Sequence, residues 1–223
     1  ATQRQLLLDY EEDIVKYAEG LDQGRILNVF RSIPLQLAKE NKKFVYGLVR
    51  EGARAREYED AIMWLCDAGE IIRTNNVSKP DIPISAYADL KSFKVFLLDV
   101  GLLRAMSKIS PKVILEGSRI FEEFKGALTE QYVCQQLQTI ADLQTYYYTN
   151  DRGSCEIDFV VDNGDRIIPV EVKAEINLRA KSLKVYQEKF QPKLSIRTSM
   201  ADYRKEDWLI NLPLYAIDQI EAL

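Results

Sequence analysis

Apolar side chains recur at every third or fourth position in two stretches of the chain, residues 25–40 and 53–68. This spacing puts them on one face of a helix, so it predicts two amphipathic helices. Pro34 lies inside the first stretch and predicts a kink or a break there, whereas Gly69 predicts the end of the second helix. An acidic stretch over residues 1–20 predicts a further helix before both of them.

Two β-strands are predicted next, over residues 71–77 and 94–98, on either side of a turn rich in Pro and Asp. Helices followed by a β-hairpin are typical of a winged helix. The pattern therefore predicts a helical, winged-helix-like domain over residues 1–110.

Three arginines, Arg50, Arg54 and Arg56, lie near the start of the second amphipathic helix. A cluster of arginines at a helix start is a candidate for contact with the phosphate backbone of DNA. Nearby acidic residues almost balance the basic ones, which instead favours a unit that packs against protein. The sequence leaves both interpretations open.

The remaining residues, 111–223, show the mixed pattern of an α/β domain, which makes α/β the predicted fold class. The expected elements are a helix at 119–139, a strand at 146–148, a hairpin at 155–173, a helix at 181–190, and strands at 194–198 and 214–217.

The hairpin contains Asn163-Gly164 between two apolar-rich runs, which is the strongest short-range signal for a two-residue turn of type I′. In that register Asp158 lies opposite Pro169, and Glu156 opposite Glu171. Opposed residues share a face of the sheet, as do alternate residues along a strand. Asp158, Glu171 and Lys173 are therefore expected on one face together with Glu156, although a bulge or a three-residue loop would reverse this parity.

Carboxylates gathered on one face repel each other unless a cation lies between them. Magnesium prefers hard oxygen ligands and takes one or two carboxylates from a protein, so Asp158 and Glu171 are the predicted metal ligands. Lys173 would add a positive charge for a phosphate group. The alternative is a solvated hairpin face on which charged residues alternate with buried apolar ones.

Glu130 lies within the apolar stripe of the predicted helix at 119–139. A buried glutamate is costly without a partner, which makes it a further site candidate. The alternative is a glutamate at the edge of the stripe that reaches solvent or pairs with an arginine.

The spacing of Asp158 from Glu171-Val172-Lys173 resembles the PD-(D/E)XK nuclease-like superfamily. That resemblance implies a restriction-endonuclease-like α/β domain over residues 111–223, with Glu130, Asp158, Glu171 and Lys173 as catalytic residues. Ile157 stands where the name-giving pattern has proline.

More narrowly, the chain resembles the uncharacterised region that follows the ATPase module in many prokaryotic AAA-superfamily ATPases. The stretches that carry this resemblance are residues 96–103, 126–130, 156–160 and 169–173. It implies an ATPase module upstream of this sequence, and ATP binding only through that module. The first residue, Ala1, is not an initiator methionine, which fits a cut made inside a longer protein.

Several chemistries are excluded by composition. The chain has no histidine, which rules out Ser-His-Asp triads and histidine-ligated metal sites within it, and it has no P-loop motif for ATP. Its three cysteines show no Cys-x-x-Cys spacing, which argues against a zinc site or a disulfide framework. Without an apolar run of membrane-spanning length or a signal peptide, we expect a cytoplasmic protein that does not enter a membrane.

Charge is unevenly distributed along the chain, whose net charge is −4. Residues 173–205 hold nine Lys or Arg against three acidic residues, and Lys181 and Lys184 among them are candidate nucleic-acid contacts. Solvated helix faces would show the same composition.

These observations predict the C-terminal accessory region of an AAA-type ATP-binding protein, acting as a nucleic-acid-binding or regulatory module with a nuclease-like fold. The first alternative is an active magnesium-dependent phosphodiesterase that cleaves DNA. The second is an oligomerisation scaffold, so nucleic acid, the ATPase module in cis and further copies of the chain are the expected partners.

Overall fold

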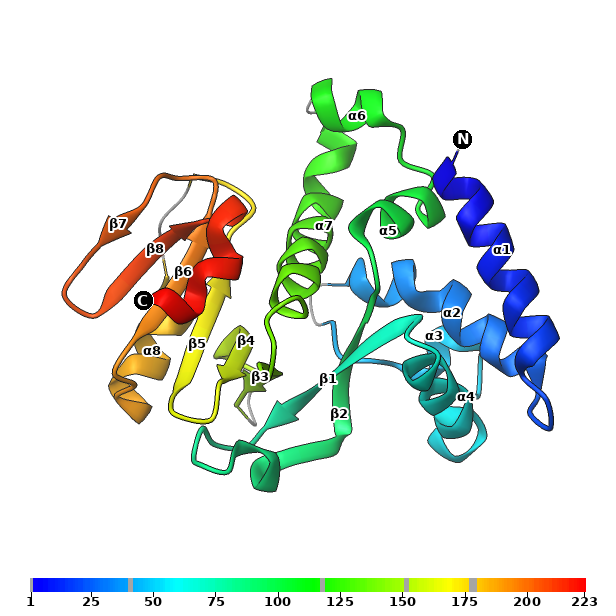
Figure 1. Ribbon diagram of the computed structural model, residues 1–223, viewed down its shortest axis with the longest axis horizontal. Coiled ribbons are helices and arrows are strands. Elements are labelled where there is room, and N and C mark those ends of the chain that lie inside the picture. Colours follow the sequence, from blue (N-terminus) through cyan, green and yellow to red (C-terminus); the bar gives the residue numbers. More distant parts are fainter. Residues whose placement is uncertain (1, 40–41, 117–118, 151–152, 177–179) are drawn as a thin grey trace. The chain divides into compact units, whose positions relative to one another are not determined.

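The computed structural model describes residues 2–39, 42–116, 119–150, 153–176 and 180–223. Helices at the N-terminus precede an eight-stranded mixed sheet (Figure 1). This confirms the predicted α/β class.

The helices are α1 (Thr2–Tyr17), α2 (Gln23–Leu37), α3 (Tyr46–Val49), α4 (Ala55–Asp67), α5 (Val100–Met106), α6 (Pro111–Glu116), α7 (Arg119–Leu137) and α8 (Lys181–Phe190), with 3₁₀ helices η1 (Ile84–Tyr87) and η2 (Leu214–Ala222). The strands are β1 (Ile71–Val77), β2 (Ala88–Leu97), β3 (Gln144–Thr149), β4 (Glu156–Asp162), β5 (Ile167–Val172), β6 (Ser195–Ser199), β7 (Arg204–Lys205) and β8 (Leu209–Pro213). Among the described helices, none has both the length and the apolar character that crossing a membrane requires.

The chain packs into two compact units. Unit 1 comprises Ala1–Arg73 and Lys94–Gln131, and unit 2 comprises Thr74–Phe93 and Tyr132–Leu223. Each unit thus contains two separate segments of the sequence. The predicted division at residue 110 stays a prediction.

The helices of unit 1 follow the predicted pattern. In α2 the side chain of Asp22 caps the N-terminus by accepting a hydrogen bond from the Arg25 amide (3.1 Å). Pro34 does not break this helix, which continues to Leu37. The first residue beyond the helix, Ala38, still donates its amide to the Pro34 carbonyl (3.0 Å).

Helix α4 stops as predicted at Gly69, whose φ of +75° suits a residue without a Cβ. The amide of Gly69 binds the carbonyl of Cys66, and that of Glu70 binds the carbonyl of Leu65. This pattern satisfies carbonyl groups that the helix end would otherwise leave free.

The two strands predicted to form a wing belong instead to the large sheet. Strand β1 has the predicted bounds, and β2 begins at Ala88, earlier than predicted. The C-terminal half of β1 pairs in parallel with β3 through Asn75↔Tyr146 and Asn76↔Tyr147. The predicted hairpin of β1 and β2 is therefore present, and it continues through β3 into the large sheet.

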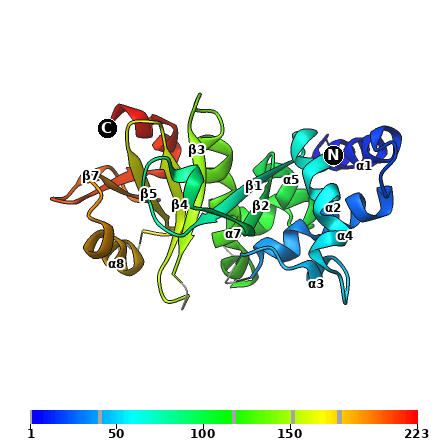
Figure 2. The same cartoon turned by 90° about the horizontal axis from the view of Figure 1, so that it is seen from below.

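The sheet has the order β2-β1-β3-β4-β5-β6-β8-β7. Strands β3, β4 and β5 form an antiparallel meander, and β6 pairs in parallel with both β5 and β8. Helix α8 makes the crossover that the parallel pair β5–β6 requires, and it packs on β4 and β5 (Figure 2). Its buried residues Leu183 and Tyr186 join a core with Tyr148, Ile157 and Val160.

The predicted strand at 214–217 is wrong, because these residues open the 3₁₀ helix η2. Strand β8 ends at Pro213, and Leu214, Ile217 and Ile220 follow at intervals of three. A 3₁₀ helix has three residues per turn, so this spacing puts them on one side.

Candidate functional site

The β4–β5 hairpin holds three of the four residues predicted for the site. Asp162 and Ile167 are the last paired residues of the two strands, so the loop between them contains four residues. Further along the strands, Val160 lies opposite Pro169. The predicted two-residue turn, with Asp158 opposite Pro169, is therefore wrong.

Side chains within the loop explain its length. The Asp162 carboxylate accepts the amide of Gly164 (2.8 Å), and the Asn163 side chain accepts the amides of Asp165 (3.3 Å) and Arg166 (3.2 Å). Of these loop residues Gly164 alone has a positive φ, +87°, whereas a type I′ turn needs two.

The longer loop moves the register by two residues, which preserves the parity of each strand. Phe159 lies opposite Val170, which is the last regular pair of the two strands, and Asp158 and Glu171 are the next residues along β4 and β5. The two predicted metal ligands thus lie close along neighbouring strands, because the Asp158 side chain binds the amide of Val172, the residue after Glu171.

A β-bulge lies at Asp158. Between the pairs Tyr146↔Val160 and Tyr148↔Ile157, β3 advances by two residues and β4 by three. Bulges occur often beside functional sites, where they redirect a side chain.

Glu171 lies on the face of the sheet that α8 covers. Its register partner on β6 is Arg197, and Ser195, two residues before Arg197, donates a hydrogen bond to Gln187 of α8 (2.8 Å). Alternate residues of a strand share a face, so Glu171, Arg197 and Ser195 all point to the α8 side.

Glu156 does not join that face. Ile157, its neighbour on β4, packs beneath α8 with Leu183. Adjacent strand residues point to opposite faces, so Glu156 points away from α8. The prediction that Glu156 shares a face with Glu171 is wrong because the bulge reverses the parity of β4 before Asp158.

The Asp158 carboxylate is held by the neighbouring strand. Its Oδ2 accepts a hydrogen bond from the backbone amide of Val172 (2.7 Å). Regular pairing of β4 with β5 ends at Phe159↔Val170. Beyond that pair, the Asp158 side chain, and not a β4 carbonyl, accepts the Val172 amide. This bond fixes Asp158 beside the peptide that joins Glu171 to Lys173.

Glu171 is almost fully buried, with 5 % of its surface exposed. Its Oε1 forms an ion pair with Lys173 Nζ (2.7 Å), while its Oε2 is buried and has no hydrogen-bond partner among the residues that the structure describes. Burial raises the pKa of the nearby Cys155 thiol, and the negative charge of Glu171 raises it further. A buried carboxylate oxygen without a partner is costly, which makes this atom a candidate metal ligand.

These residues fit a hard cation that needs few protein ligands. Magnesium takes one or two carboxylates and keeps several waters, as the pair Asp158 and Glu171 would allow. Within the described ranges, no three Asp, Glu, Cys or His residues are grouped as metal ligands. Water or a substrate oxygen would therefore have to complete the coordination.

A polar row continues from Glu171 across three more strands on the same face. The registers Glu171↔Arg197, Arg197↔Asn211 and Arg204↔Asn211 align these residues. Arg197 is 2 % exposed and donates from Nε to Asn211 Oδ1 (2.9 Å), and Nη2 lies 3.5 Å from Glu206.

From the sequence, Arg197 is only one residue of the basic strip 173–205. Its position at the centre of a short strand, with every residue of that strand buried, is the signal that would have distinguished it. A fully buried arginine is rare unless it is paired.

Glu130 belongs to unit 1 and lies on α7. It is 6 % exposed and forms a 2.5 Å ion pair with Lys42, and Lys94 Nζ lies 3.9 Å away. Of the two alternatives, Glu130 is thus the buried one, and the cations beside it are lysines of the same unit. Whether it assists Asp158 and Glu171 stays a prediction.

The three arginines predicted to contact DNA are exposed around the start of α4. Arg50 follows α3, Arg54 is the N-cap residue of α4, and Arg56 lies in its first turn. The Arg54 amide donates to the Glu57 carboxylate (2.8 Å). This contact orders the helix start and leaves the arginine side chains on the surface.

Lys181 and Lys184 are exposed on the first turn of α8. Helix α8 lies on the face that carries Glu171, and its N-terminus follows β5 after a short connection. Arg179, a further member of the basic strip, lies outside the described residues.

Comparison with known protein families gives two matches. Residues 1–113, just over half of the 223-residue chain, match the family described as domain of unknown function (DUF8612). The chain belongs to the DUF8612 family. Residues 125–216 of this DUF8612 protein match a second family, domain of unknown function (DUF4143), and that part contains Glu130, Asp158, Glu171 and Lys173. No curated protein and no solved structure matches the DUF8612 chain.

Proposed function

We propose that this DUF8612 chain is the C-terminal accessory region of an AAA-type ATP-binding protein and that unit 2 acts on nucleic-acid phosphodiesters. The observation that carries the proposal is the buried Oε2 of Glu171, which has no hydrogen-bond partner among the described residues, next to the Val172 amide that binds Asp158. In this proposal Asp158 and Glu171 hold a magnesium ion, and Lys173 contributes a positive charge.

The order of elements supports a nuclease-like assignment. The elements follow along the chain in this order: helix α7, the antiparallel meander β3-β4-β5, the crossover helix α8 and the parallel strand β6. The DUF4143 match spans this order from part of α7 to β6. This order of helix and strands, together with the sequence resemblance to the PD-(D/E)XK superfamily, supports a nuclease-like domain.

Each residue has a separate task in the proposed reaction. When bound, magnesium would activate a water and stabilise charge on a phosphoryl oxygen. Asp158, held at the strand edge by Val172, and Glu171, buried beside it, fix the ligand oxygens. Lys173, which is paired with Glu171 in this structure, would be the positive charge available to a bound phosphate.

The nucleic-acid backbone would approach from the start of α8. A helix N-terminus carries a partial positive charge, and exposed Lys181 and Lys184 add two full charges there. Arg50, Arg54 and Arg56 of unit 1 offer a second basic group on the surface.

A second candidate is a binding module without catalysis. The 2.7 Å ion pair between Lys173 and Glu171 neutralises the carboxylate without any metal. Such a site would bind nucleic acid through the lysines of α8 alone, and its affinity would not depend on a divalent cation.

A cleavage assay on the whole chain tests the proposal. Labelled single-stranded and duplex DNA are incubated with magnesium or manganese and each of four proteins: wild type, Asp158→Ala, Lys173→Ala and, as a control in the same hairpin, Asp165→Ala. The proposal expects cleavage by the wild type and the Asp165 variant, with a loss of about 100-fold or more in the other two.

Calorimetric titration with manganese separates the two candidates. Saturable binding that is lost in Asp158→Asn and Glu171→Gln supports the metal site. DNA binding that is unchanged by EDTA, together with no metal heat and no cleavage, would favour the binding module and reject catalysis.

A further inference from the structure

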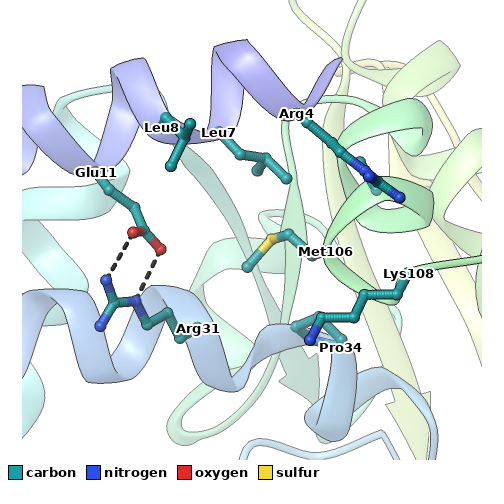
Figure 3. Close-up of a pocket in the computed structure, with 9 residues that line it drawn as sticks. Arg4, Leu7, Leu8, Glu11, Arg31, Pro34, Met106 and Lys108 are labelled. Carbon is teal, nitrogen blue, oxygen red and sulfur yellow. Dashed lines mark hydrogen bonds and ion pairs between the residues drawn. The ribbon is translucent and has the colours of Figure 1, made fainter. Parts of the chain in front are cut away.

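Unit 1 contains a groove between α1 and α2 that the end of α5 closes, with a volume of about 760 Å³ (Figure 3). Four residues of α1 line it: Arg4, Leu7, Leu8 and Glu11. Their spacing of three and four residues places them on one stripe of the helix. The groove is independent of the Asp158 site and lies outside the proposed phosphodiester chemistry.

The opposite wall and the floor come from α2 and α5. Pro34 and Arg31 lie on α2, Ala105 and Met106 end α5, and Lys108 follows it. Together with Leu7 and Leu8, these residues give the groove an apolar centre with charged ends (Figure 3).

The two ends differ in charge. At one end Glu11 and Arg31 form a two-pronged ion pair of 2.8 and 2.6 Å, and this bond lowers the pKa of Glu11. At the other end lie Arg4 and Lys108 (Figure 3), and the described residues that line the pocket around them include no acidic side chain. That end therefore carries two positive charges that an acidic group can neutralise.

Lys108 is held in an unusual backbone conformation. Its φ is +55°, in the left-handed region where glycine or asparagine is usual. Its amide binds the carbonyl of Ala105, so the strained residue also ends α5. A lysine in this conformation lowers the stability of the folded protein by about 1 kcal/mol relative to glycine. Its side chain lines the groove.

Two exposed leucines extend the apolar surface beside the groove. Leu8 is 54 % exposed, and Leu35, one helical turn beyond Arg31 on α2, is 52 % exposed. A small molecule inside the groove would leave both leucines in water. A protein helix laid along the groove would cover them, because helix-in-groove binding buries apolar residues at intervals of three and four.

We infer that this groove binds an amphipathic helix of a partner protein, with aliphatic residues along one face and carboxylates at the end that meets Arg4 and Lys108. The aliphatic face would cover Leu7, Leu8 and Met106. The carboxylates would select the orientation, because like charges at that end would oppose binding.

A designed peptide tests the inference. The probe is a fluorescent helical peptide with leucines at positions i, i+3, i+4 and i+7 and glutamates at one end, and its partner probe has lysines in place of the glutamates. Fluorescence anisotropy with the wild-type chain is expected to show affinity for the acidic peptide at least about tenfold higher than for the basic one.

Charge reversal should exchange these preferences. In the variant Arg4→Glu/Lys108→Glu, the basic peptide should bind better than the acidic one, while Lys16→Glu, also on α1 but off the stripe, should change neither affinity. Leu8→Ser should weaken both peptides several-fold without altering the unfolding transition, because Leu8 is an exposed rim residue.

Four outcomes would overturn the inference. Equal binding of both peptides by the wild type, or an unchanged preference in the charge-reversed variant, would remove the electrostatic basis. Stronger binding of dodecanoate, with displacement of the peptide, would identify a small amphiphile as the occupant. Self-association detected by light scattering and abolished by the charge reversal would identify a second copy of the chain.

Discussion

The carboxyl group of Glu70 provides the sharpest test of the electrostatics in unit 1. Burial raises its pKa from 4.5 to about 7, and the charge of Asp13 adds to the rise. Glu70 also follows the C-terminus of α4, where its amide binds the Leu65 carbonyl and the helix dipole disfavours a negative charge. The perturbation is Glu70→Gln, which removes the charge and keeps the size.

The sign of the pH dependence follows from the direction of this shift. Between the unfolded pKa of 4.5 and the folded pKa of about 7, the folded state holds a proton on Glu70 that the unfolded state has lost. Stability therefore falls as pH rises through this window. The full shift corresponds to about 3 kcal/mol, which we reduce to about 1–2 kcal/mol because solvent screens this half-exposed group.

Urea unfolding of wild type and Glu70→Gln, at about pH 5 and about pH 8, measures the effect. The variant should be about 1–2 kcal/mol more stable than wild type at the higher pH and nearly equal at the lower one. Glu51→Gln, at an exposed position, is the matched control and should show neither change. A stability difference in Glu70→Gln that is the same at both pH values would refute the reasoning.

Further predictions concern buried polar groups in both units. Lys42→Met should destabilise the protein by about 3–5 kcal/mol in urea unfolding, because it leaves the buried Glu130 with one cation fewer. Adding Glu130→Gln to this variant should restore part of the lost stability. No restoration would contradict the ion-pair argument. Arg197→Met should cost about 2–3 kcal/mol by the same measurement through loss of its bond to Asn211, and a cost under about 0.5 kcal/mol would show that the bond contributes little. The thiol of Cys155, whose pKa burial raises, should react with a disulfide reagent only after urea is added, and rapid reaction of the folded protein would contradict its burial.

Local features were predictable because neighbours in sequence determine them. The period of apolar residues predicted α2 and α4, and Gly69 marked the end of α4. The hairpin at Asn163-Gly164 was also predictable, and with it the neighbouring positions of Asp158 and Glu171. The face on which each residue was expected did not depend on the exact loop length, because the error in the register was an even number of residues.

Features that depend on contacts across the chain were not predictable. The bulge at Asp158 arises from how β4 meets β3, and it turned Glu156 to the other face. The parallel pairing of Asn75 with Tyr146 joins residues far apart in sequence. The bond between Arg197 and Asn211 likewise forms only when β6 and β8 lie side by side.

The interleaving of the two units has a consequence for how this protein can be cut or exchanged. The chain passes from one unit to the other at residues 73, 93 and 131, so no single cleavage separates them. A fragment limited to the DUF4143 match, residues 125–216, would lack the segment that supplies Val77 and Ile84 to the core beneath α8. During synthesis, unit 1 cannot complete its folding until residue 131 has left the ribosome. Val77 and Ile84 stay exposed to solvent until β3 and β4 have been synthesised. In this chain, a recombination junction between the two family matches would therefore separate Val77 and Ile84 from the core that they complete.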